Sequence, residues 1–270
     1  MNLLGAYTPG SSSIHKLDNA VRITDFAILF AAFVVASGFV WGYILSLSVL
    51  LFVFRMAGAP IKPVAAMFWR FRVFLLTVFL MNAFFQPSER PYFSFWIVTF
   101  SLDGVLFGLR MIMSIMLLTA LSSVLTATAT PVEITDGLRT VLHPLSFLKI
   151  PVDEASSIIS IAISFIPVLA SEGESIILSA RARGALPGGR KIKDRALSLI
   201  PLALPLFLSA FRRADELASA MEARGYTGEK GRKRKIRIAF GRRESLSLHF
   251  SLLILLGAIA LKGVFNVHTS

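Results

Sequence analysis

The sequence predicts an all-α, polytopic membrane protein with about five transmembrane helices and long helices on the cytoplasmic side. Hydrophobic residues make up 55% of the 270 residues, and the mean hydropathy is +0.70. Only 16% of the residues are charged, whereas soluble domains carry about 25%. A soluble chain of this length could not bury so much apolar surface. The positive charge is also concentrated in one segment, as is typical of a cytoplasmic loop.

The first hydrophobic segment, residues 26–54, is an uncharged run of 29 residues. One span needs about 20 residues, so the run is too long for one helix and short for two. Arg22 and Arg55 bracket it, and a hairpin keeps both on the cytoplasmic side. We therefore predict two short helices, at about residues 22–38 and 42–56.

Three further spans follow from the remaining apolar runs, at residues 73–85, 102–126 and 246–265. The stretch 86–91 between the first two is expected to be an external loop. Arg110 lies inside the second of these runs, so it should face protein or water rather than lipid, and a buried interhelical partner is the favoured interpretation.

Charge assigns the sides of the membrane. Of the 28 Lys and Arg, 17 lie between Arg181 and Arg243, together with five acids, so this stretch carries the entire net charge of +12. Basic loops stay in the cytoplasm, which places the N-terminus inside and the C-terminus outside. The predicted organisation is a cytoplasmic N-terminal segment at 1–21, four transmembrane helices at 22–128, a cytoplasmic module at 129–245 and a last transmembrane helix at 246–270.

Within the cytoplasmic module the sequence predicts amphipathic helices. Thr130-Pro131 ends the preceding span, and a new helix begins near Pro151, with acids suited to its N-terminal end. A turn is expected at 186–195, a kinked helix at 196–211 and a flexible tether at 227–243. Apolar residues recur at helical spacing on both long helices; they include Ile158, Ile161, Phe165, Leu169, Leu217 and Met221.

The sequence offers little for catalysis. Its four histidines are scattered and it has no cysteine, so no metal-ligand spacing is present. It also lacks the glycine-rich lysine loop that binds ATP in P-loop proteins and the nucleophile elbow of hydrolases. We therefore expect a non-catalytic chain without metal or cofactor.

The distinctive feature is a repeated tripeptide, Ala182-Arg183-Gly184 and Ala223-Arg224-Gly225. Glycine just past a helix end is a common cap, and arginine in the last turn suits the helix dipole, so one copy would indicate only a helix stop. Two copies, each after an apolar stripe in the basic segment, favour two helix ends that dock into two similar pockets. Arginine is well suited to forked hydrogen bonds with a partner's oxygens.

These residues resemble the transmembrane T component of energy-coupling factor (ECF) transporters, a family that imports vitamins and transition metals. The resemblance lies in residues 7–10 with 14–18, in residues 144–185 and in residues 214–226. At the N-terminus the sequence departs from the family pattern, because Lys16 stands where the family usually has arginine and Asn19-Ala20-Val21 stands where basic residues are usual.

The resemblance implies a mechanism and partners. Two cytoplasmic ABC-type ATPases would each receive one helix end, carrying Arg183 or Arg224, and would bind the ATP themselves. Their closure would reorient a separate membrane subunit, the S component, that binds and selects the substrate. The apolar residues listed above on the two coupling helices would face it. The protein would reside in the cell membrane and bind no nucleic acid.

Two alternatives stay open. A conventional ABC permease also couples to ATPases, but its cytoplasmic helix typically carries a single Glu-Ala-Ala…Gly loop instead of two arginine ends. A membrane enzyme acting on lipids or isoprenoids would need clustered acids or histidines at one membrane face. Binding of nucleic acid by residues 232–243 is disfavoured, because a short basic run beside a span is usually a topology determinant.

Overall fold

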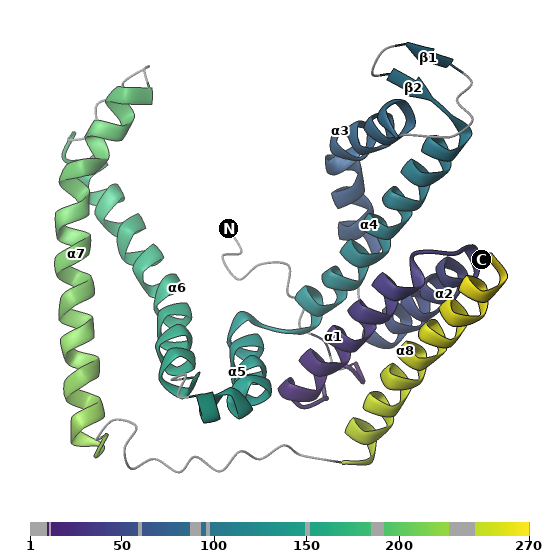
Figure 1. Ribbon diagram of the computed structural model, residues 1–270. Helices are drawn as coiled ribbons and strands as arrows, with labels where there is room; N and C mark the ends of the chain where they lie inside the picture. Colours follow the sequence, from purple (N-terminus) through teal and green to yellow (C-terminus); the bar gives the residue numbers. More distant parts are fainter. Residues whose placement is uncertain are drawn as a thin grey trace. The chain divides into compact units, whose positions relative to one another are not determined.

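The computed structural model describes residues 10, 12–58, 61–86, 93–95, 98–148, 152–184, 192–226 and 241–269. It divides into two compact units (Figure 1). The membrane unit contains α1–α5, a small β-hairpin and α8, and the second unit contains a short 3₁₀ helix, η1, with α6 and α7. The prediction of an all-helical polytopic protein is confirmed, apart from that hairpin.

The membrane unit is built on five long helices: α1 (Asn19–Ala36), α2 (Val40–Ala57), α3 (Ile61–Phe85), α4 (Leu102–Thr128) and α8 (Arg242–Thr269). Asp18 caps α1 by accepting a hydrogen bond from the Ala20 amide, and Ser101 caps α4 by accepting one from Gly104. The core comes from the facing sides of α1, α2, α3, α4 and α8, and Phe33, Leu121 and Ile254 are among its buried residues. Outward-facing side chains are largely apolar, as lipid requires.

The first uncharged run forms the predicted hairpin, with α1 and α2 joined at residues 37–39. The turn is tight because a side chain at Gly42 would overlap the Ala36 carbonyl oxygen. Tyr43 fixes it by donating a hydrogen bond to the Ser37 carbonyl, at 2.6 Å. The same hydroxyl lies 3.0 Å from Ser114 Oγ, which ties the turn to α4.

The next helix is longer than predicted. The apolar run begins at Val73, but α3 begins at Ile61 and continues through the basic stretch. Arg72 lies over the Trp69 ring, 4.4 Å from its centroid, so the positive charges are accommodated on helical turns rather than in a loop. Beyond Gln86, strands β1 (Phe93–Phe95) and β2 (Val98–Phe100) pair antiparallel; the predicted loop at 87–91 lies outside the described residues.

Arg110 is exposed on α4. The expectation of a buried interhelical partner is therefore wrong.

The ends of the spans limit how often the intervening segment can cross the membrane. Arg22, near the start of α1, donates a hydrogen bond to the Thr128 carbonyl at the end of α4. Asp25, one turn along α1, accepts hydrogen bonds from Ser247 and Ser251 in the first turns of α8. The end of α4 and the start of α8 therefore lie at the same end of the membrane unit, which we call the Arg22 end. The chain between them must cross the membrane an even number of times.

Six helices in the described part of the chain are long and apolar enough to span a membrane, one more than predicted. The sixth is α6 (Val152–Ala182), which we expected outside the membrane. Its apolar composition explains the difference, but α6 cannot cross alone, because an odd number of crossings would put α8 at the wrong end. Either α6 and α7 both cross or neither does.

The link between the units starts at α5 (Pro131–Leu142), which groups with the membrane unit. Thr130 and Glu133 form a capping box: the Glu133 carboxylate accepts from the Thr130 amide and Thr130 Oγ1 accepts from the Glu133 amide. A side chain at Gly137 would overlap the Asn19 carbonyl oxygen, so α5 packs closely against the start of α1.

The second unit consists of η1 (His143–Leu148), α6 and α7 (Ile192–Ala223). The apolar stretch 196–211 is not a separate helix, because α7 runs unbroken from before it to the second tripeptide. The predicted turn at 186–195 is correspondingly shorter, and residues 185–191 lie outside the described part. The same holds for most of the tether, residues 227–240.

Candidate functional site

The first tripeptide lies at the C-terminus of α6. The Gly184 amide donates to the Arg181 carbonyl at 3.0 Å, and the Arg183 amide donates to Ser179 at 3.2 Å. Gly184 has a φ of +70°, the left-handed conformation in which glycine ends helices without strain. Arg183 is thus the residue immediately before the left-handed cap that ends α6.

The second tripeptide ends α7 with a more complete version of the same cap. The Gly225 amide donates to Glu222 at 2.8 Å, and the Tyr226 amide donates to Met221 at 2.9 Å. With a φ of +76° at Gly225, these are the two bonds of a Schellman motif. The two tripeptides therefore place Arg183 and Arg224 in the same position relative to a helix end.

Both helix ends are open. All six residues of the two tripeptides are exposed, namely Ala182, Arg183, Gly184, Ala223, Arg224 and Gly225. A side chain built on either capping glycine would meet nothing within 4 Å. The glycines are thus required by backbone conformation alone, and the arginine side chains are free to reach a partner.

The two ends lie far apart within the second unit. Arg213 on α7 pairs with Glu172 on α6 at 3.1 Å, which aligns the antiparallel helices at that level (Figure 1). Arg183 lies eleven residues beyond Glu172, and Arg224 lies eleven beyond Arg213 in the opposite direction. At about 1.5 Å per residue the two ends are separated by roughly 33 Å along the hairpin. One binding pocket could not hold both.

The predicted partner-facing stripe is only partly exposed. Ile158 is 66% exposed, whereas the other five predicted residues are half-buried: Ile161, Phe165, Leu169, Leu217 and Met221. Other large apolar side chains of the second unit are more open; they are Ile159, Ile166 and Leu178 on α6 and Leu204, Phe207, Leu208 and Phe211 on α7. Helical spacing finds apolar stripes but does not show which of them lies against the neighbouring helix.

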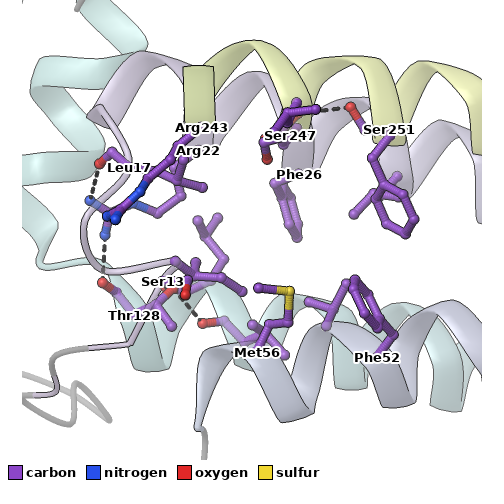
Figure 2. Close-up of a pocket in the computed structure, with 18 of the residues that line it drawn as sticks. Ser13, Leu17, Arg22, Phe26, Phe52, Met56, Thr128, Arg243, Ser247 and Ser251 are labelled. Carbon is purple, nitrogen blue, oxygen red and sulfur yellow. Dashed lines mark hydrogen bonds between the residues drawn. The ribbon is translucent and has the colours of Figure 1, made fainter. Parts of the chain in front are cut away.

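A polar junction at the Arg22 end was not predicted from the sequence. The Arg22 side chain is 5% exposed and ties together the ends of three helices. It reaches Thr128 at the end of α4, the Asn19 side chain at 2.8 Å and Glu133 of α5 at 3.4 Å. It also donates to the Leu17 carbonyl, at 3.4 Å (Figure 2). Of this junction, only the capping-box pattern from Thr130 to Glu133 can be recognised in the sequence. The partners that join Arg22 to α4 and α5, Thr128 and Glu133, lie more than 100 residues away.

Comparison with known proteins agrees with this architecture. Residues 10–235 match the family model of the cobalt transport protein CbiQ. The chain belongs to the CbiQ family. A relative from Listeria innocua, named energy-coupling factor transporter transmembrane protein EcfT, is 34% identical over 95% of this chain and 96% of its own length. Another, from Bacillus subtilis, is 33% identical over 94% and 95% of the two chains. A relative from Listeria monocytogenes is 36% identical over 86% and 87%.

The CbiQ match covers both tripeptides and the Arg22 junction, and the EcfT relatives align over nearly their whole length. The chain is therefore a multi-pass transmembrane component of energy-coupling factor transporters. The resemblance seen in the sequence is confirmed at the level of the family.

Proposed function

We propose that this chain is the energy-coupling transmembrane subunit of an ECF-type importer. It transmits the ATP-driven closure of two ATPase subunits to a separate substrate-binding membrane subunit, which takes up a vitamin or a transition-metal ion. The chain itself binds neither ATP nor substrate and catalyses no reaction. The names of the EcfT relatives support this role.

The observation that carries the proposal is the pair of exposed, identically capped ends at Arg183 and Arg224. Each offers a guanidinium at a helix end, where it can donate several hydrogen bonds to carboxylates or carbonyls of a pocket. A separation of roughly 33 Å along α6 and α7 suits two ATPases side by side, one for each end. Movement of the two ATPases toward each other would then act on the two ends of one helical hairpin.

The exposed apolar side chains of α6 and α7 support the second half of the proposal. Phe207 and Phe211 are 62% and 63% exposed, and their rings lie 6.1 Å apart on successive turns of α7. Such a patch suits an apolar membrane partner. We assign to it the substrate-binding subunit, together with the predicted stripe that includes Ile158.

The test is co-purification of the ATPases with charge-reversal variants. Arg183→Glu or Arg224→Glu should leave the protein in the membrane but reduce ATPase recovery at least tenfold, because each replaces a hydrogen-bond donor by a repelling acid. Arg181→Glu and Arg212→Glu are matched controls, since both side chains are exposed on the same helices and lie outside the tripeptides. Normal ATPase recovery with the double variant Arg183→Glu/Arg224→Glu would refute the proposal.

A conventional permease is distinguished by reconstitution. If the purified chain and the ATPases transport substrate without a third membrane protein, the chain forms its own pathway. We expect transport only when a substrate-binding subunit is present.

A further inference from the structure

A pocket of about 650 Å³ opens at the Arg22 end of the membrane unit (Figure 2). Its walls come from the first turns of α1 and α8, the last turns of α2 and α4, and residues 13–17 of the N-terminal segment. This volume is within the range of about 300–1,000 Å³ that is usual for small-molecule sites. The coupling role proposed above makes no use of it.

The pocket has a distinctly amphipathic lining. Its interior is apolar and is formed by residues including Phe26, Leu29, Phe52, Val53, Met56 and Leu121. Among the described lining residues the charged groups lie toward one end: Lys16, Arg22 and Arg243, with Asp25 as the one acid. Both carboxylate oxygens of Asp25 already accept hydrogen bonds, from Ser247 and Ser251. Arg22 is also paired with Glu133 at 3.4 Å. Three bases against these two acids leave the charge at the pocket positive.

Arg22 supplies a donor without an acceptor. Its two terminal nitrogens are engaged with the chain, as described above, but the Nε–H has no hydrogen-bond partner among the described residues. The side chain is 95% buried, at 5% exposure, and an unmade hydrogen bond at such a group is costly. The Nε atom is itself buried, so an anionic oxygen in the pocket would satisfy it after a small shift of the Arg22 side chain.

The depth of the pocket indicates the ligand class. From Arg22 to Leu29 on α1 the lining extends seven residues, or about 10 Å, from the charged end toward the middle of the span. A ligand would have a negative head at the membrane surface and an apolar part pointing inward. Basic pockets between transmembrane helices at one membrane face bind the headgroups of anionic lipids in this way.

We infer that this pocket holds one anionic glycerophospholipid, with its phosphate near Arg22, Lys16 and Arg243 and the upper part of an acyl chain against Phe26, Leu29 and Met56. The lipid completes the hydrogen bonding of Arg22. It would also fill the space enclosed by α1, α2, α4 and α8.

The test is lipid retention measured by native mass spectrometry. The full chain is released from nanodiscs of equal phosphatidylglycerol and phosphatidylcholine, and bound lipids are identified. We expect one phosphatidylglycerol per chain, retained in preference to phosphatidylcholine. Arg243→Gln should lower that preference about fivefold, the effect of one basic residue on an anionic lipid. Arg242→Gln is the matched control, because this neighbouring exposed arginine does not line the pocket.

A second variant tests the apolar end. Met56 lines the pocket and is 40% exposed, so Met56→Trp can fill the space without disturbing the core. It should remove the bound lipid whatever its headgroup. Equal retention of both lipids by the unmodified chain, or unchanged retention in both Arg243→Gln and Met56→Trp, would overturn the inference. The readout does not involve the ATPases, so it is independent of the proposed coupling role.

Discussion

Replacing Gly225 by alanine should disorder the end of α7 without any steric clash. The left-handed conformation at a φ of +76° costs an L-residue about 1–2 kcal/mol, and an added methyl would meet nothing within 4 Å. The whole effect therefore comes from the backbone. A free-energy change of this size shifts the local equilibrium about 5- to 30-fold toward the uncapped end.

Hydrogen exchange measures the loss of the cap directly. The Tyr226 amide donates to Met221 at 2.9 Å only while the cap is formed, so its protection should fall by about that factor in Gly225→Ala. If Arg224 must be held at a capped end to enter its pocket, ATPase binding should weaken by a similar factor. Gly225→Asn should lose less of both, because asparagine tolerates the left-handed region better than alanine.

Gly173 provides a control of opposite sign. It lies inside α6, has no positive φ and has no atom within 4 Å of an added methyl. Gly173→Ala should therefore stabilise its helix by about 0.5–1 kcal/mol. If Gly225→Ala leaves Tyr226 as protected as before, the cap does not hold α7 as described. If protection falls but ATPase binding is unchanged, the helix end is not the docking element.

The remaining predictions concern the Arg22 end. Gly137→Ala should lower the thermal midpoint in detergent, because the methyl would overlap the Asn19 carbonyl and overpacking costs about 1–3 kcal/mol. Arg22→Gln should destabilise by about 3 kcal/mol, since it removes a buried charge-assisted hydrogen bond to Thr128. Arg55 is exposed in the last turn of α2, so Arg55→Gln should leave the thermal midpoint unchanged. Equal shifts for the two arginine variants would contradict a stabilising role of the Arg22 junction.

Much of the architecture was predictable because its signals are local. Long apolar runs define spans, and glycine after an arginine-ended helix defines a cap, so the α1–α2 hairpin and both tripeptide ends could be read from the sequence. The first turns of α3 could not, because the predicted span was limited to the apolar run from residue 73, and Arg70 and Arg72 precede that run. In the structure these residues continue the helix beyond its apolar part, with Arg72 over Trp69.

The two tripeptide ends of the candidate site were predictable from the sequence, whereas the exposed apolar surface along α6 and α7 was less so. Residues at helical spacing define a stripe, but the loss of exposure at Phe165 and Leu169 depends on how the chain packs around them, which no local pattern encodes. The Arg22 junction was even harder to predict from the sequence. It joins Arg22 to Thr128 and Glu133, more than 100 residues away, and a buried arginine there reads in the sequence as an ordinary positive residue flanking a span.

The even number of crossings between α4 and α8 makes the membrane topology testable. The chain has no cysteine, so single cysteines can be introduced without background at the exposed positions Ala182, Ala223 and Gly38. Gly38 lies in the α1–α2 turn, at the opposite end of the membrane unit from Arg22. If α6 and α7 both stay on one side, an impermeant maleimide should label Ala182→Cys and Ala223→Cys from the face opposite to Gly38→Cys.

If α6 and α7 instead both cross, Ala182→Cys should label from the same face as Gly38→Cys, while Ala223→Cys labels from the other. The length and apolar character of α6 allow that arrangement. The concentration of 17 Lys and Arg between Arg181 and Arg243 opposes it, because crossing would carry Arg181 and Arg183 to the far side with the rest of the turn. Two ATPases on one side of the membrane can receive both arginine ends only if α6 and α7 do not cross, so labelling of Ala182→Cys from the Gly38 face would refute the coupling role.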